Sequence, residues 1–164
     1  MMKTYKIDEK TNLIIEDSVI LKLNEYSQGK GMYESGGILL GKVKADFSEY
    51  IITNISEPCN EDGRGRCFFV RSKDNAQKII NDFWRSSCGE IMYFGEWHTH
   101  PELYPSPSYV DRKLIKQCSV EIKPLPAFIF LIIVAERGSL YVGCKNVSVG
   151  KNLLVKLDEV EGEK

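Results

Sequence analysis

The sequence predicts an α/β fold in which a mixed β-sheet is flanked by helices on both faces. Short apolar runs rich in β-branched residues recur along the chain, and the longest covers residues 127–135. Three other stretches carry apolar residues at helical spacing and begin near positions 19, 72 and 108. Because strands and helices are mixed along the chain, we expect them to pack as the layers of an α/β or α+β sandwich.

Length and composition favour one soluble domain. The chain has 164 residues, of which 43% are hydrophobic and 27% are charged, as in an ordinary globular protein with a sizeable core. We expect one domain over residues 1–164, with a polar, frayed tail from about residue 158. The net charge of -1 argues against nucleic acid or an anionic membrane surface as a partner. No apolar run reaches the roughly 18–20 residues that a membrane span requires.

Cysteine usage and the N-terminus favour the cytoplasm. The N-terminal residues lack the apolar core of a signal peptide. The five cysteines are odd in number and include no C-x-x-C pair, so we expect free thiols in a reducing compartment.

The first third of the chain predicts a short strand, a helix and then a hairpin of two strands. Residues 13–15 are expected to form a short strand, and the helix after it has an apolar stripe that ends before Gly29. Residues 36–41 and 50–55 are expected to form a hairpin that turns around residues 44–46.

The middle of the chain predicts a loop, a short strand and a second helix. Residues 58–66 carry two glycines, two arginines and two acids, so we expect an exposed, mobile loop. Residues 67–70 are expected to form a short strand. Ser72 or Asp74 then caps a helix that ends at Gly89. Its apolar stripe comprises Ala76, Ile79, Ile80 and Phe83.

The second half predicts the remaining strands and the third helix. Residues 91–98 are expected to form a strand, and three prolines then force an irregular connection. The third helix covers residues 108–118. Residues 127–135 form a central strand with a hairpin partner at residues 139–144, and residues 153–155 add a last element.

The two histidines of the chain indicate a metal site. His98 and His100 are separated by one residue at the end of a predicted strand, where residues i and i+2 point to the same face. Asp111 follows eleven residues later. Two imidazole nitrogens and one carboxylate leave a fourth position for water, which is the arrangement of a catalytic zinc site.

Five residues together resemble the signature of the JAMM metalloproteases, also called the JAB/MPN domain. The signature is an upstream glutamate, then H-x-H, seven residues and S-x-x-D. Glu34, His98, His100, Ser108 and Asp111 match it position for position. The segment ESGGILLG, which begins at Glu34, also resembles the E-x-G-G-x-L-x-G strand of the family. The resemblance covers roughly residues 10–145.

The resemblance implies a JAB/MPN fold, related to that of cytidine deaminases, and a role for each residue. His98, His100 and Asp111 would hold Zn²⁺, Glu34 would bind the water and carry its proton, and Ser108 would steady the tetrahedral intermediate. The family cleaves peptide or isopeptide bonds next to the C-terminus of ubiquitin-like proteins. Stand-alone prokaryotic members resemble deconjugating peptidases encoded beside E1- and E2-like genes. One such setting is the CBASS antiphage operon, where the enzyme releases a conjugated nucleotidyltransferase.

Each residue also has a purely structural explanation. Asp111 would stabilise the first turn of a helix, and Ser108 would cap that helix or do both jobs. Glu34 taken alone would be a surface glutamate beside a glycine turn. Glu96 shares a face with His98 in a regular strand and could be its partner, whereas Trp97 faces the core. Trp84 is likewise expected to pack.

A slim substrate tail would suit a groove in which it lies as an added strand. Its expected walls are residues 58–66 and 102–107. Tyr104, Phe68 and Phe69 are candidate contacts or simple packing residues.

Three other classes of function remain as alternatives. A non-catalytic JAB/MPN scaffold usually lacks the metal ligands, which this chain retains. A zinc deaminase needs H-x-E followed by P-C-x-x-C, and neither pattern occurs here. A metal-dependent nuclease would be expected to carry a basic patch.

Overall fold

The structure, a computed structural model, describes residues 2–29, 31–148 and 153–161. The strands within these residues are β1 (Lys3–Lys6), β2 (Asn12–Ile15), β3 (Gly36–Val43), β4 (Glu49–Ile55), β5 (Gly63–Arg64), β6 (Phe69–Val70), β7 (Met92–Thr99), β8 (Phe128–Val134), β9 (Leu140–Asn146), β10 (Val155–Lys156) and β11 (Asp158–Glu159). The helices in the same residues are α1 (Asp17–Glu25), α2 (Lys73–Ser86) and α3 (Tyr109–Glu121).

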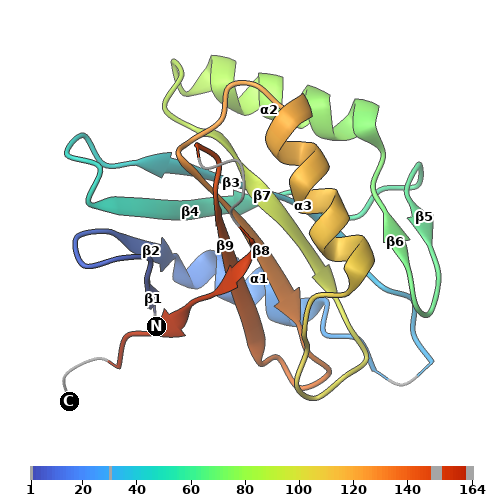
Figure 1. The fold of residues 1–164 in the computed structure, drawn as a ribbon. Helices are drawn as coiled ribbons and strands as arrows, with labels where there is room; N and C mark the ends of the chain where they lie inside the picture. Colours follow the sequence, from blue (N-terminus) through green and yellow to red (C-terminus); the bar gives the residue numbers. More distant parts are fainter. Residues whose placement is uncertain (1, 30, 149–152, 162–164) are drawn as a thin grey trace.

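Nine of these strands form one mixed sheet, in the order β10-β9-β8-β7-β3-β4-β2-β1-β11 (Figure 1). The pairs β2/β4 and β7/β8 are parallel, and the other neighbours are antiparallel. Strands β5 and β6 form a separate two-stranded hairpin beside α3. The predicted α/β class with a mixed sheet is confirmed.

Helices cover both faces of the sheet, as the sequence predicts (Figure 1). Val19 and Leu23 of α1 belong to one buried cluster, while α2 and α3 contribute to a second cluster on the opposite face. Side chains of β3 alternate between the two faces of the sheet and so reach both clusters. Leu39 packs in the cluster with α1, and Ile38 and Leu40 pack in the cluster with α2 and α3. A strand buried on both faces reads as a continuous apolar run.

A β-bulge changes the alternation of β7. Leu39 of β3 pairs with Gly95 and Leu40 pairs with Tyr93, so Phe94 is the extra residue. Gly95 has a φ of 139°, and a Cβ at this position would lie 1.8 Å from the carbonyl oxygen of Phe130. Because of the extra residue, Tyr93 and Glu96 point to the same face although they are three positions apart.

Side-chain caps fix the starts of α2 and α3. Ser72 rather than Asp74 caps α2, because its hydroxyl accepts a hydrogen bond from the N–H of Asn75 at 3.2 Å. Ser108 caps α3, which begins one residue after the predicted start.

The segment of residues 58–66 is more structured than predicted. Gly63–Arg64 forms β5, which pairs with the short strand β6 at Phe69–Val70. The carboxylate of Asp62 accepts backbone N–H bonds from Cys59 and Ser72, both at 2.7 Å. A strand therefore replaces the expected loop at Gly63–Arg64, whereas most of residues 58–66 are exposed, as expected.

One edge of the sheet also corrects the sequence prediction. Strand β1, which was not predicted, pairs with β2 and with β11. The expected frayed tail from residue 158 is wrong at Asp158–Glu159, because these residues pair with β1 and Glu159 bonds to Lys3 at 2.8 Å. Residues 162–164 of that tail lie outside the described residues.

The two tryptophans differ in burial. Trp97 is 1% exposed, and its indole N–H donates to the carbonyl oxygen of Ser56, as expected for a core residue. Trp84 is 38% exposed and packs over Gly89, outside the buried core. Within the described ranges, none of the helices has both the length and the apolar character to span a bilayer.

Candidate metal centre

The two histidines lie at the end of β7. His98 is the penultimate residue of the strand, and His100 follows it with its backbone N–H bonded to the carbonyl oxygen of Val134 in β8. Their Nε2 atoms are 3.1 Å apart, and the two rings are tilted by 45°. The strand end thus presents both imidazoles to one point, as the i, i+2 spacing predicts.

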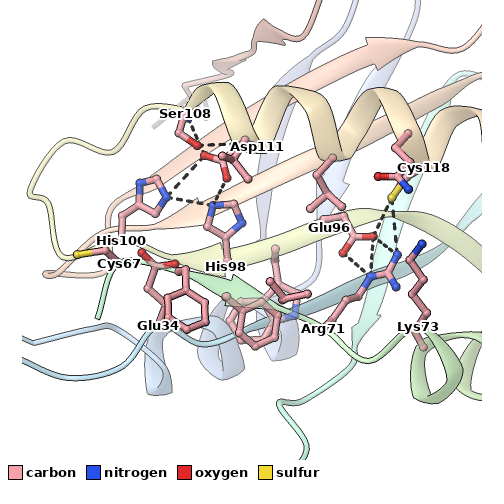
Figure 2. Close-up of a pocket in the computed structure, with 18 of the residues that line it drawn as sticks. Glu34, Cys67, Arg71, Lys73, Glu96, His98, His100, Ser108, Asp111 and Cys118 are labelled. Atoms are coloured by element: carbon pink, nitrogen blue, oxygen red, sulfur yellow. Dashed lines mark hydrogen bonds and ion pairs between the residues drawn. The ribbon is translucent and has the colours of Figure 1, made fainter. Parts of the chain in front are cut away.

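Asp111 reaches the same point from the first turn of α3 (Figure 2). Its Oδ1 lies 3.1 Å from Nε2 of His98, and its Oδ2 lies 3.7 Å from Nε2 of His100. The structure therefore brings together three side chains that the sequence singles out, with one ligand atom from each lying within 4.8 Å of the others.

The donor set fits a divalent cation of the zinc type. Two ligands bound to zinc at roughly 2.0–2.1 Å in a tetrahedral array lie about 3.3 Å apart. The observed separations of 3.1 and 3.7 Å bracket that value. Two imidazole nitrogens and one carboxylate are also ligands that zinc accepts. The three residues can therefore hold a metal ion and leave one position open.

The pKa shifts of His100 and Asp111 suit metal binding. Burial and the neighbouring His98 lower the pKa of His100, although Asp111 and Glu102 oppose this effect. Burial raises the pKa of Asp111, but the hydrogen bond and charge of His98 and the hydrogen bonds of Ser108 outweigh it and lower the pKa to about 2. A neutral imidazole and an ionised carboxylate are the forms that bind metals.

Glu34 lies beside the three candidate ligands, two residues before β3 (Figure 2). Its side chain is buried and lines the same pocket as His98, His100 and Asp111. Burial, together with the charges of Asp111 and Glu102, raises its pKa to about 7, while His98 acts in the opposite direction. A carboxyl group with this pKa exchanges a proton readily near neutral pH.

The glycines after Glu34 permit close packing. A Cβ at Gly36 would lie 2.6 Å from the carbonyl oxygen of Trp97 and from the ring of Phe69. A Cβ at Gly37 would lie 2.4 Å from the hydroxyl of Ser56. Glycine therefore lets β3 approach both the metal-ligand strand and the 67–71 segment.

A groove of about 690 Å³ leads from the metal-ligand cluster along α3. Residues 67–71, including Cys67 and the exposed Phe68 and Val70, form one wall. Val110, Leu114 and other residues of α3 form another. The groove is largely apolar, with the polar cluster at one end and an ion pair further along (Figure 2).

The predicted walls need correction. The groove is lined by residues 67–71 instead of residues 58–66, and of residues 102–107 only Glu102 contributes. Phe68 and Phe69 do line the groove, whereas Tyr104 is 90% exposed and lies outside its lining. The hairpin explains the shift, because residues of β6 line the groove and those of its partner β5 do not.

Glu96 does not contact the histidines, although it lines the same groove as His98. Its carboxylate binds Arg71 with contacts of 2.8 and 3.0 Å and accepts the hydroxyl of Tyr93 at 2.7 Å. The thiol of Cys118 lies 3.4 Å from the same carboxylate. The suggestion that Glu96 is a partner of His98 is therefore wrong. The sequence carried no signal for Arg71, which is one basic residue in a polar stretch.

Comparisons with known proteins agree with this architecture. Residues 17–143 match the family described as "Prokaryotic homologs of the JAB domain". A relative from Escherichia coli called "CD-NTase/cGAS isopeptidase" is 34% identical over 151 residues, which cover 92% of each chain. A relative of the same name from Vibrio cholerae is 30% identical over 142 residues, 86% of each chain.

A solved structure shares the fold. The solution structure of a protein from Desulfitobacterium hafniense superposes with a TM-score of 0.53 at 17% identity, and the match covers 90% of this chain and 88% of that one. At this identity the likeness concerns the fold alone. The family resemblance read from the sequence motif is confirmed, and the chain belongs to the prokaryotic homologs of the JAB domain.

Proposed function

We propose that this chain is a zinc-dependent isopeptidase that hydrolyses the amide bond between the C-terminus of a conjugated protein and an amine. The observation that carries the proposal is the convergence of His98, His100 and Asp111 within 4.8 Å, beside the buried Glu34. Family membership supports a metal-dependent hydrolase. The choice of zinc rests on the donor set of two imidazoles and one carboxylate.

His98, His100 and Asp111 serve as the metal ligands in this proposal. When bound, zinc supplies Lewis acidity, which polarises the scissile carbonyl and lowers the pKa of a coordinated water to about 7. Glu34 accepts the proton of the attacking water and delivers it to the departing amine. The buried position of its carboxylate beside the ligands supports this role.

Ser108 serves as a hydrogen-bond donor to the developing oxyanion. Its oxygen accepts the N–H of Asp111 as a helix cap, at 3.2 Å. Capping uses an oxygen lone pair, so the hydroxyl proton remains to be donated. One residue can therefore cap α3 and stabilise the transition state, which a single donor does by about 2.7–4 kcal/mol in other hydrolases.

The groove along α3 holds the C-terminal tail of the substrate in an extended conformation. The apolar wall of Phe68 and Val70 supplies contact area, and Val110 faces it from α3. The two relatives are named for CD-NTase, and this chain aligns with 92% of the Escherichia coli protein. We therefore place the substrate in the same class, a CD-NTase conjugated through its C-terminus. The five free cysteines support action in the reducing cytoplasm.

The test uses a CD-NTase joined through its C-terminal carboxyl group to the ε-amine of a lysine in a carrier peptide. The zinc-loaded protein is expected to release the CD-NTase, and 1,10-phenanthroline is expected to stop the release until zinc is added back. His98→Ala is expected to lose both zinc and activity. Glu34→Gln is expected to keep zinc and lose activity, and the exposed Glu9→Gln serves as its control.

The outcomes separate the proposal from a scaffold. Release that persists after zinc removal would overturn the metal-dependent mechanism. Purification of the native protein without stoichiometric metal, together with no release of the carrier, would favour a non-catalytic role instead. Equal loss of zinc in Glu34→Gln and His98→Ala would overturn the division between ligand and proton carrier.

A further inference from the structure

A buried glutamine lies behind the metal-ligand cluster. Gln28 is 1% exposed and follows α1. Its amide nitrogen donates to the carbonyl oxygens of Met32 at 2.8 Å and Arg66 at 3.0 Å. Its amide oxygen accepts the hydroxyl of Thr99 at 3.2 Å. Both amide hydrogens and the amide oxygen are thus engaged, each with a different segment of the chain.

Thr99 connects Gln28 to the metal-ligand strand. It lies between His98 and His100, and its side chain is fully buried. Its hydroxyl donates to Gln28 and accepts the backbone N–H of Ser35 at 3.0 Å. Its own backbone N–H donates to the carbonyl oxygen of Ser35 at 2.8 Å. Thr99 therefore binds both the backbone N–H and the carbonyl oxygen of Ser35, the residue that follows Glu34.

The backbone of Glu34 is held by the β5–β6 hairpin. Its N–H donates to the carbonyl oxygen of Gly65 at 2.7 Å, and its carbonyl oxygen accepts the guanidinium of Arg64 at 2.9 Å. The same guanidinium donates to the hydroxyl of Ser35 at 2.6 Å. Gln28 fixes this hairpin through Arg66, the next residue after Gly65, and fixes the turn before Glu34 through Met32.

We propose that Gln28 is a positioning residue for Glu34, which sets the distance between the Glu34 carboxylate and the metal ligands by holding three segments together. The segments are the turn at residues 31–35, the base of the β5–β6 hairpin and the end of β7. This inference rests on the proposed function of Glu34. Gln28 does not line the groove, so it acts only through the backbone that it binds.

The arrangement predicts a specific kinetic effect. Gln28→Ala removes all three hydrogen bonds but leaves every metal ligand and the groove unchanged. Positional errors of catalytic groups lower kcat more than substrate binding, so we expect kcat to fall by about 10–100-fold with unchanged KM. Zinc affinity is expected to stay at the wild-type value. Gln28→Glu is expected to have a larger effect, because a carboxylate would face the carbonyl oxygens of Met32 and Arg66.

A second pair of variants tests the same network from the other end. Thr99→Val removes the hydroxyl with little change in volume and is expected to lower kcat as Gln28→Ala does. Thr99→Ser keeps the hydroxyl and is expected to restore kcat relative to Thr99→Val. Asn81→Ala, on the exposed face of α2 and outside the lining of the groove, is the control for loss of a side-chain amide.

Hydrogen exchange gives a readout that needs neither metal nor substrate. In the metal-free protein, Gln28→Ala is expected to speed exchange of the Glu34 and Ser35 amides at least tenfold, while amides in β8 keep their protection. Unchanged exchange at these two amides would overturn the proposal, as would unchanged kcat in a Gln28→Ala protein that exchanges faster. Equal loss of zinc and kcat would also overturn it, because the effect would then lie on the ligands.

The same experiments distinguish this inference from the proposed function. If the wild-type protein releases no CD-NTase, the proposed function fails, and amide exchange still decides whether Gln28 holds the Glu34 segment. If Gln28→Ala does not fold, the comparison of Thr99→Val with Thr99→Ser carries the test, and equal kcat in these two variants overturns the proposal.

Discussion

Ser108 and Asp111 cap the start of α3 reciprocally. The backbone N–H of Ser108 donates to Oδ2 of Asp111 at 2.6 Å, and the backbone N–H of Asp111 donates to Oγ of Ser108 at 3.2 Å. This capping box leaves Oδ1 of Asp111 facing His98 at 3.1 Å. A helix cap and a candidate metal ligand are thus the same side chain.

The first prediction separates the cap from the hydroxyl donor at Ser108. Ser108→Ala is expected to cost about 1 kcal/mol of unfolding free energy, whereas Ser108→Gly costs only a few tenths, because glycine is tolerated at an N-cap. Both variants lack the hydroxyl, so both are expected to lose kcat by about 10²-fold. Urea unfolding and cleavage kinetics measure the two effects. Equal kcat in wild type and Ser108→Gly would remove the hydroxyl from the mechanism.

The second prediction concerns the thiol of Cys67, which is exposed and lines the groove. A bulky maleimide on this thiol is expected to obstruct the substrate tail and inhibit cleavage. Cys67→Ser is expected to remain active after treatment, whereas Cys88→Ser is expected to stay sensitive, because Cys88 lies outside the groove lining. Inhibition that persists in Cys67→Ser would show that the thiol responsible lies elsewhere.

The third prediction concerns the ion pair of Arg71 and Glu96, whose side chains are 14% and 3% exposed. Glu96→Ala leaves a buried guanidinium without its partner and is expected to cost about 3–5 kcal/mol of unfolding free energy. The double variant with Arg71→Met is expected to cost less than the sum of the single changes. Glu121→Gln, which disrupts the exposed contact with Lys73, is the control and is expected to leave stability unchanged. Additive effects of the two changes would contradict the coupling.

The fourth prediction concerns stability at alkaline pH. Burial raises the pKa of the Cys118 and Cys144 thiols from 9.0 to about 12. Between these values the unfolded chain releases the two protons and the folded chain retains them. Stability therefore falls as pH rises, by at most about 1.4 kcal/mol per pH unit for each thiol.

Urea unfolding between about pH 8 and pH 10 measures this dependence. Cys144→Ala is expected to reduce the slope of unfolding free energy against pH, whatever its effect on stability at neutral pH. Cys67→Ala changes an exposed thiol and is the control. An identical slope in wild type and Cys144→Ala would contradict the assignment.

Local patterns predicted most of the fold. Strands β3 and β8 were found because their apolar runs reflect burial on both faces, and β4 was found from its aromatic and β-branched residues. Helix α2 was found from its cap and apolar stripe. The spacing of His98 and His100 predicted their convergence, because it depends only on strand geometry. The addition of Asp111 rested on its position eleven residues after His100, and the family resemblance supported it.

The missed features depend on partners far away in the sequence. Strand β1 and the tail strand β11 have little apolar character of their own and form because they pair with each other. Arg71 and Gln28 are recognisable only when their partners, Glu96 and Thr99, are placed beside them. The bulge at Phe94 depends on the close approach of Gly95 to Phe130, which no alternation pattern encodes.

That bulge divides β7 into two segments, and side chains alternate regularly between the faces of the sheet within each segment. His98 and Glu96 keep their orientation through the parallel pairing with β8, in which Glu96 lies opposite Leu131 and His98 opposite Ile133. Removing one residue at Phe94 would therefore restore regular alternation along β7, with Tyr93 and Glu96 still on one face and the histidines in place. A chain that is one residue shorter at this bulge can therefore keep the same placement of its two histidines.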